Sequence, residues 1–157
     1  MTVFFMIIVL AIILQLAAAA GLNPLKAFRD NARLATGAAF IFTGVSHFLI
    51  PEKFMEMMPP FLPAPMFLIY LSGVFEILGG IGLMFSKTKR AATAGLILLL
   101  LAVFPANVYV ALENAQLGGF MNYAVYQWLR LPMQFVLIAW VWWCGAGYKL
   151  WRKSYES

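Results

Sequence analysis

Apolar residues gather in five long runs, and most charged residues fall in the short segments between them. The runs are Val3–Ala20, Leu34–Ile50, Met66–Phe85, Ala91–Leu112 and Tyr126–Tyr148. Each run has about 17 to 23 residues, and a helix needs about 20 to cross a hydrocarbon layer about 30 Å thick. The pattern therefore predicts an all-α membrane protein with five transmembrane helices.

The composition supports this prediction and excludes two other classes of protein. The chain is 64% hydrophobic and 11% charged, with a mean hydropathy of +0.87, whereas about a quarter of the residues of a soluble domain are charged. The net charge of +5 comes from short basic clusters between apolar runs, so we expect no nucleic-acid partner. The single cysteine, Cys144, excludes a disulfide framework and a metal site built from cysteines.

The basic residues predict the orientation in the membrane. Nine of the eleven fall on one side of an alternating path: Lys26, Arg29, Arg33, Lys87, Lys89, Arg90, Lys149, Arg152 and Lys153. Loops on the other side carry only Lys53 and three glutamates. Because cytoplasmic loops hold the excess of lysine and arginine, we expect a plasma-membrane protein with its N-terminus outside and its C-terminus in the cytoplasm. Trp128 and Trp151 then mark the outer and inner interfaces.

The first run has one feature of a signal peptide, the segment "LAAAA" near its end. No basic residue precedes the run, however, and signal peptides begin with a positively charged region. We therefore expect a retained first transmembrane helix.

A few polar side chains lie inside the runs, where an ionisable group is costly unless it is paired or hydrated. They include His47, Ser72, Glu76, Asn107, Arg130 and Gln134. The rise of a helix places His47, Glu76, Asn107, Arg130 and Gln134 roughly 5 to 15 Å below the outer ends of their runs. Helical side chains lean toward the helix N-terminus, which brings groups on oppositely directed helices to one level. The sequence thus predicts a polar pocket in the outer half of the membrane.

Individual members of this set also have simpler interpretations. Glu76 and Arg130 can form an ion pair that only holds helices together, and the two amides can join helices by hydrogen bonds. His47 by itself is typical of an interfacial histidine. The presence of all of them on four runs favours a cavity for an amphipathic small molecule or a lipid.

The stretch "GVSHFLIPEKFMEMMPPFLPAP", which begins at Gly44, connects the second run to the third. Its "EKFMEMM" segment predicts a short interfacial helix, and the prolines that follow predict a rigid return, so that together they form a lid over His47 and Glu76. Methionine thioethers with His47 suit Cu(I), but methionines at a membrane surface usually act as flexible apolar side chains. We therefore expect no metal site.

Four segments between Ala35 and Trp143 carry a resemblance to a known family. They read "FIFTGVSHFLIPEKFMEMMP", "YLSGVFEILGGIGL", "AATAGLILLLLAVFPANVYVAL" and "WLRLPMQFVLIAW". In this order they resemble the DoxX-like membrane proteins. The signature of that resemblance falls on residues already singled out by depth: His47, Glu76, Asn107, Arg130 and Gln134.

The resemblance implies a DoxX-like four-helix transmembrane bundle over residues 34–157. Residues 1–33 then form an additional transmembrane helix followed by a basic cytoplasmic loop. The wider family includes a subunit of a thiosulfate:quinone oxidoreductase, and distant relatives include a chaperone of receptor assembly. The resemblance leaves open whether this chain is itself an enzyme.

Three functional hypotheses follow. The first is a redox-associated subunit that binds a quinone or another amphipathic small molecule. The second is a non-enzymatic chaperone or assembly factor that binds a lipid or the transmembrane segment of a partner protein. The third is a lipid isomerase-like enzyme in which His47 and Glu76 act as acid and base.

Overall fold

The computed structural model describes residues 2–21, 28–113 and 123–146, which form helices joined by turns, with no strand among them. The helices are α1 (Thr2–Ala19), α2 (Phe28–Leu49), α3 (Pro51–Met55), α4 (Pro65–Met84), α5 (Lys89–Glu113) and α6 (Ala124–Gly145). The all-α class expected from the sequence is therefore confirmed for these residues. Several residues of the topology argument lie outside the described part of the chain: Lys26, Lys149, Trp151, Arg152 and Lys153.

Each predicted run corresponds to one long helix, but α2 begins well before its run. Arg29 and Arg33 lie within α2 instead of in a loop, and the expected boundary between residues 33 and 34 falls inside this helix. Asp30 explains the early start, because a carboxylate in the first turn favours a helix N-terminus and its Oδ1 lies 3.0 Å from Arg33 Nη2. Asn31 adds a contact with α1, since its Nδ2 donates to Gln15 Oε1 over 2.9 Å.

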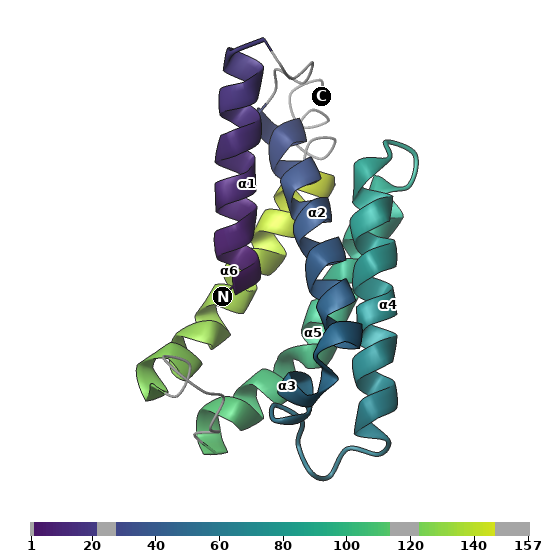
Figure 1. Ribbon diagram of the computed structural model, residues 1–157, viewed down its shortest axis with the longest axis vertical. Helices are drawn as coiled ribbons and strands as arrows, with labels where there is room; N and C mark the ends of the chain where they lie inside the picture. The colour runs from purple at the N-terminus through teal and green to yellow at the C-terminus, as the bar shows by residue number, and fades with distance from the viewer. Residues whose placement is uncertain (1, 22–27, 114–122, 147–157) are drawn as a thin grey trace, which may run out of the picture.

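Four of the long helices close a ring in which α2 contacts α4, α4 contacts α5, α5 contacts α6, and α6 returns to α2. α1 packs along the outside of α2, and the short α3 lies against α2 and α4 (Figure 1). Successive long helices run in opposite directions. One end of the molecule, which we call the basic end, therefore collects the start of α2, the α4–α5 turn and the end of α6. The opposite end, which we call the lid end, collects α3 and the segment that follows it.

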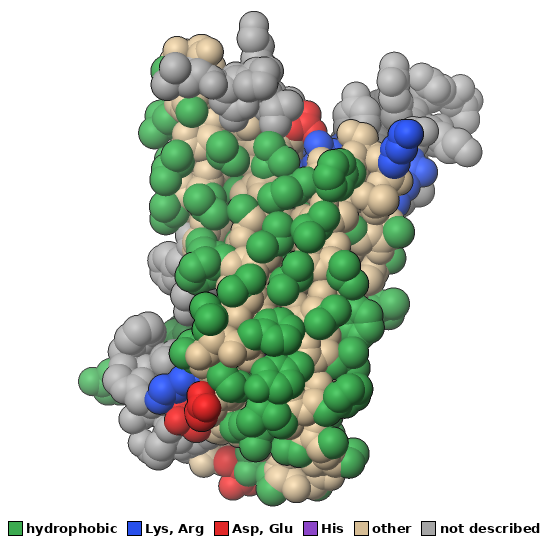
Figure 2. All heavy atoms as spheres, turned by 45° about the vertical axis from the view of Figure 1, so that its right-hand side comes forward, with side chains coloured by type: hydrophobic (Ala, Val, Ile, Leu, Met, Phe, Trp, Pro, Cys, Tyr) green, Lys and Arg blue, Asp and Glu red, His purple; other side chains and the backbone are tan. Residues whose placement is uncertain are grey.

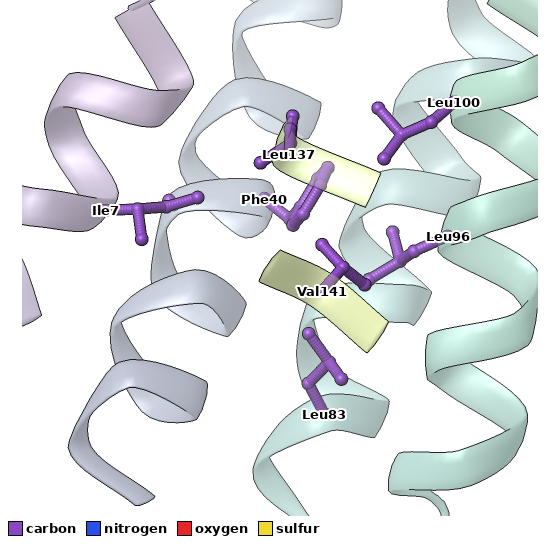
Figure 3. Close-up of a cluster of buried hydrophobic side chains, with 8 residues drawn as sticks. Ile7, Phe40, Leu83, Leu96, Leu100, Leu137 and Val141 are labelled. Atoms are coloured by element: carbon purple, nitrogen blue, oxygen red, sulfur yellow. The ribbon is translucent and has the colours of Figure 1, made fainter. Parts of the chain in front are cut away.

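A cluster of buried apolar side chains fills the half of the ring nearer the basic end, and Figure 3 shows seven of its members pointing toward one another. Its buried members come from five helices: Ile7, Ala39, Phe40, Leu83, Leu96, Leu100, Leu137 and Val141. This cluster thus occupies one half of the bundle's length, with Leu100 and Leu137 at its limit toward the lid end.

Close contact between α2 and α4 depends on glycine at two levels. A Cβ on Gly44 would lie 2.7 Å from the carbonyl oxygen of Gly73, and a Cβ on Gly80 would lie 2.6 Å from that of Gly37. Small residues let helix backbones approach in this way. Because two pairs of glycines meet in the same antiparallel alignment, they set the register between the two helices.

The outer surface of the ring is apolar between two charged ends. Figure 2 shows hydrophobic side chains covering the middle of the visible face, with charged side chains near its two ends. Large apolar residues are exposed on every long helix, among them Leu16, Phe42, Phe67, Leu98 and Phe135. Within the described residues, α4 and α5 are each long and apolar enough to cross a membrane.

Candidate functional site

A cavity of about 450 Å³ lies inside the ring at the lid end, between α2, α4, α5 and α6. Leu100 and Leu137 belong both to the core and to the cavity wall, so the cavity begins where the core packing stops. The cavity wall includes all six residues that the sequence singled out: His47, Ser72, Glu76, Asn107, Arg130 and Gln134. Their convergence from four helices is thus a feature of the structure, whereas a role in ligand binding remains a prediction.

The first polar group, on α2 and α4, is built around His47, which is 7% exposed. His47 Nδ1 lies 2.9 Å from the carbonyl oxygen of Ile69 and 3.0 Å from Ser72 Oγ. A carbonyl oxygen only accepts hydrogen bonds, so the ring carries a proton on Nδ1. The other ring nitrogen, Nε2, faces Glu76 with 3.7 Å between it and Oε1.

Glu76 is held from its other side by α2. Thr43 Oγ1 donates to Glu76 Oε2 over 2.7 Å, and Thr43 precedes His47 by one helical turn, so both reach the same carboxyl group. This arrangement depends on the glycine register, because a Cβ on Gly73 would lie only 2.8 Å from His47 Cβ. Close helix packing therefore positions the histidine and the carboxyl group together.

The second polar group joins α5 to α6 and runs from Arg130 toward the core. Arg130 Nη2 donates to Asn107 Oδ1 over 2.8 Å, and Asn107 Nδ2 donates to Gln134 Oε1 over 2.6 Å. Gln134 Nε2 in turn donates to the backbone carbonyl of Leu100. Asn107 and Gln134 each accept a hydrogen bond through the amide oxygen and donate one through the amide nitrogen, which fixes the orientation of both side chains. The fixed Asn107 oxygen in turn determines how the Arg130 side chain enters the cavity.

Proline explains why α5 bends near this chain of hydrogen bonds. Pro105 lies inside α5 and lacks the amide hydrogen that would bond to the carbonyl of Leu101. The half of α5 nearer the lid end turns away from α4 in Figure 1, as expected where a proline interrupts the hydrogen bonds. This bend makes room for the cavity beside Glu76.

The lid expected over the cavity is present as α3 and the segment after it. Phe54 lies over the His47 ring with 3.9 Å between ring centroids, and Met57 Sδ accepts a hydrogen bond from Arg130 Nη2 over 3.6 Å. Prolines begin both α3 and α4, at Pro51 and Pro65, where a missing amide hydrogen is tolerated. The lid thus touches both polar groups.

The ion pair that the sequence allowed between Glu76 and Arg130 is not present in the described part of the chain. Among the described residues, Glu76 forms no ion pair with Arg130; it faces His47 and Thr43 instead. The physical reason is that Asn107 and Met57 provide acceptors close to the guanidinium group, while the glycine contact brings α2 nearest to Glu76. Thr43 was not predicted from the sequence, although its spacing of four residues before His47 places both on one helix face.

The two polar groups can do different chemistry. His47 Nε2 and Glu76 Oε1 lie 3.7 Å apart and both residues border the cavity, so these two titratable groups face a bound molecule together and each can accept a proton from it or donate one to it. Arg130 has five N–H donors, of which the bonds to Asn107 and Met57 use only the Nη2 group, and it stays charged. The cavity therefore combines a proton-carrying pair with a permanent cation on an otherwise apolar wall.

One protein-family model covers the four helices of the ring. A family model described as "Domain of unknown function (DUF8561)" matches residues 36–145. The chain belongs to this family. The DUF8561 match begins in α2 and ends with α6, so it contains both polar groups and the lid. No curated protein and no solved structure matches the chain.

Proposed function

We propose that this member of the DUF8561 family is a multi-pass membrane protein whose cavity binds a quinone or a closely similar amphipathic molecule, as a subunit that serves a redox system. The observation that carries the proposal is the cavity itself: about 450 Å³ with apolar walls and two polar groups supplied by four helices. Ligand cavities of roughly 300 to 1,000 Å³ with a few oriented polar groups are typical of small-molecule sites.

Membrane insertion is supported by an inverted distribution of side chains. Phe42 is 64% exposed and Leu98 is 66% exposed, while Asn31 and Gln127 are almost completely buried. An apolar outer surface suits contact with lipid tails, and polar groups inside a bundle suit contact between helices. The charged residues at the two ends fit the five-span arrangement that the alternating helix directions allow.

A quinone headgroup matches the two polar groups because its oxygen atoms lie on opposite edges of a ring. One oxygen accepts a hydrogen bond from the unused donors of Arg130. The other meets His47 Nε2 and Glu76, which accept the proton of a quinol hydroxyl group as the partner redox system removes an electron, or return a proton to the quinone oxygen as that system supplies one. Phe54, Met57 and the apolar wall of the cavity then cover the quinone ring. The resemblance to DoxX-like proteins, which include a subunit of a quinone-dependent oxidoreductase, favours the same ligand.

The first experiment measures binding of a short-chain quinone to the purified protein in lipid nanodiscs. We expect saturable binding that raises the midpoint of thermal unfolding. Arg130→Gln should weaken binding about tenfold or more, because a hydrogen bond from a charged donor contributes about 1.5 to 3 kcal/mol. Arg90→Gln, which removes an exposed charge at the basic end, is the matched control and should bind as the wild type does.

Two results would count against the proposal. Equal binding by the wild type and Arg130→Gln would show that the quinone lies outside the cavity. Native mass spectrometry in mild detergent that finds a stoichiometric membrane protein and no quinone would favour the assembly-factor hypothesis instead.

A further inference from the structure

We infer that the ligand of this cavity enters sideways from the lipid, between α2 and α6, and that it carries an apolar tail which stays in that opening. This inference rests on the proposed function and adds to it the route of entry and the class of ligand. It identifies a lipid-dissolved, tailed molecule and not a water-soluble metabolite.

The first observation is that, among the described residues, the hydrogen bonds between α2 and α6 lie toward one end of the two helices. Arg29 Nε donates to the carbonyl of Trp143 over 2.8 Å, and Trp140 Nε1 donates to Thr36 Oγ1 over 2.9 Å. Both contacts lie at the basic end. At the lid end Arg130 and Gln134 of α6 form hydrogen bonds with Asn107 of α5 instead. The two helices therefore separate toward the lid end, and the cavity lies between them there.

The second observation is a change along one face of α2. Ala32, Ala35 and Ala39 are 1% exposed or less, and Ala39 belongs to the apolar core cluster together with Ile7 of α1. The same face continues toward the lid end with Phe42 and Ser46, which follow at helical spacing. Phe42 is 64% exposed, Ser46 is half-buried, and both line the cavity.

Ile50, one turn further, is 49% exposed and also lines the cavity. A row of side chains that borders the cavity and is exposed at the same time marks an opening. Its two large members, Phe42 and Ile50, are apolar, so the opening suits a hydrocarbon tail better than a hydrated group.

The third observation concerns the other route, through the lid. Phe54 lies over His47, and Met57 accepts a hydrogen bond from Arg130. Entry from the water phase would have to break both contacts, whereas entry between α2 and α6 breaks neither. A headgroup that arrives from the side reaches both polar groups while its tail remains against Phe42 and Ile50.

The experiment compares two quinones with the same headgroup, one without a tail and one with a tail of ten carbons, in nanodiscs of constant lipid content. The measured quantity is the ratio of their dissociation constants, which isolates the contribution of the tail. We expect Phe42→Ser to lower the tail preference roughly fivefold, because it removes a large apolar contact. Phe67→Ser is the control, since Phe67 is 63% exposed on α4 and does not line the cavity.

The possible outcomes separate this inference from the proposed function. A tail preference that falls in Phe42→Ser and persists in Phe67→Ser supports the lateral opening. An unchanged preference in Phe42→Ser, with binding still sensitive to Arg130→Gln, overturns the opening and leaves the proposed function intact. Absence of binding that depends on Arg130 overturns the proposed function itself.

A tail-end photoreactive group gives an independent measurement without any substitution. After irradiation, peptide mapping should place the adducts on the α2 peptide that contains Phe42 and Ile50, or on α6 near Met133, which also lines the cavity. Adducts confined to Phe54 and Met58 in the lid would show that the tail leaves through the lid and would overturn the inference.

Discussion

At the scale of single residues, the hydrogen-bond partners of Arg130 and Glu76 determine how the polar side chains of the cavity are arranged. Arg130 bonds to an amide oxygen and a thioether, and Glu76 bonds to a hydroxyl group beside a histidine. The Glu76 carboxyl group and the Arg130 guanidinium group line one cavity without forming a direct pair. Both therefore keep hydrogen-bonding capacity for a molecule placed between them, which a closed ion pair would not.

This arrangement predicts where energetic coupling occurs. In a double-mutant cycle, Thr43→Val and Glu76→Gln should be non-additive by about 0.5 to 3 kcal/mol, because the two side chains share a hydrogen bond. Glu76→Gln with Arg130→Gln should show a smaller coupling. The measurement is unfolding in mixed detergent micelles. A larger coupling for the charged pair would mean that Glu76 and Arg130 do interact directly in solution.

The sequence predicted the members of the site better than their partners. Spacing and depth selected His47, Glu76 and Arg130 because a charged or titratable group inside an apolar run stands out. The sequence could not show that Glu76 faces Thr43, because that choice depends on which helix approaches α4 most closely. A hydroxyl group in a membrane helix commonly bonds to its own backbone, so Thr43 gave no signal of its own.

At the scale of helices, the α2–α4 contact determines the geometry of the first polar group. The two glycine pairs bring the backbones together, and the short distance places His47 against the carbonyl of Ile69. On α5 and α6, amide side chains perform the equivalent task across a wider separation. The cavity lies where closely packed helices face helices that are held apart by long side chains.

Glycine substitutions test this account. Gly73→Ala should destabilise the protein by about 1 to 3 kcal/mol, because an added methyl group would meet His47 and the backbone of Gly44. Gly95→Ala is the matched control, since nothing lies within 4 Å of a Cβ at that position, and it should be neutral or stabilising because alanine favours helix. Thermal unfolding of both variants in one detergent provides the measurement. Equal stability of the two variants would contradict the close approach.

The helices themselves were largely predictable, because long apolar runs bounded by polar segments leave few alternatives. α3 was also expected from the segment after Pro51. The start of α2 was not, because Arg29, Asp30 and Arg33 look like a loop until an internal ion pair and a neighbouring helix are considered. Hydropathy measures the cost of charges in lipid and not their interactions with one another.

At the scale of the whole molecule, the distribution of charge separates the two ends. Arg29, Arg33 and the lysine and arginine residues of the α4–α5 segment lie at the basic end, and Lys53 forms an ion pair with Glu56 at the lid end, with 3.3 Å between Nζ and Oε1. The fully packed core lies toward the basic end and the cavity toward the other. If the basic end is cytoplasmic, the cavity faces the outer leaflet.

Reporter fusions test this orientation. A cytoplasmic reporter placed after Arg90 or after Ser157 should be active, and one placed after Pro60, in the lid, should be inactive. The expected pattern follows from the bias of basic residues toward the cytoplasm. Activity after Pro60 together with inactivity after Arg90 would reverse the orientation and place the cavity in the inner leaflet.

The two glycine contacts also limit how the chain can change in length. Gly37 and Gly44 on α2 meet Gly80 and Gly73 on α4, and the spacing is the same in both helices. Insertion of a single residue between the glycines of either helix would rotate everything beyond it by about 100°, which would turn His47 or Glu76 out of the cavity. Insertions and deletions should therefore be tolerated in the lid segment and in the α4–α5 turn, but not between these glycines. Two glycines at this interval in each of two consecutive long helices provide a length-invariant pattern for recognising proteins that share the site.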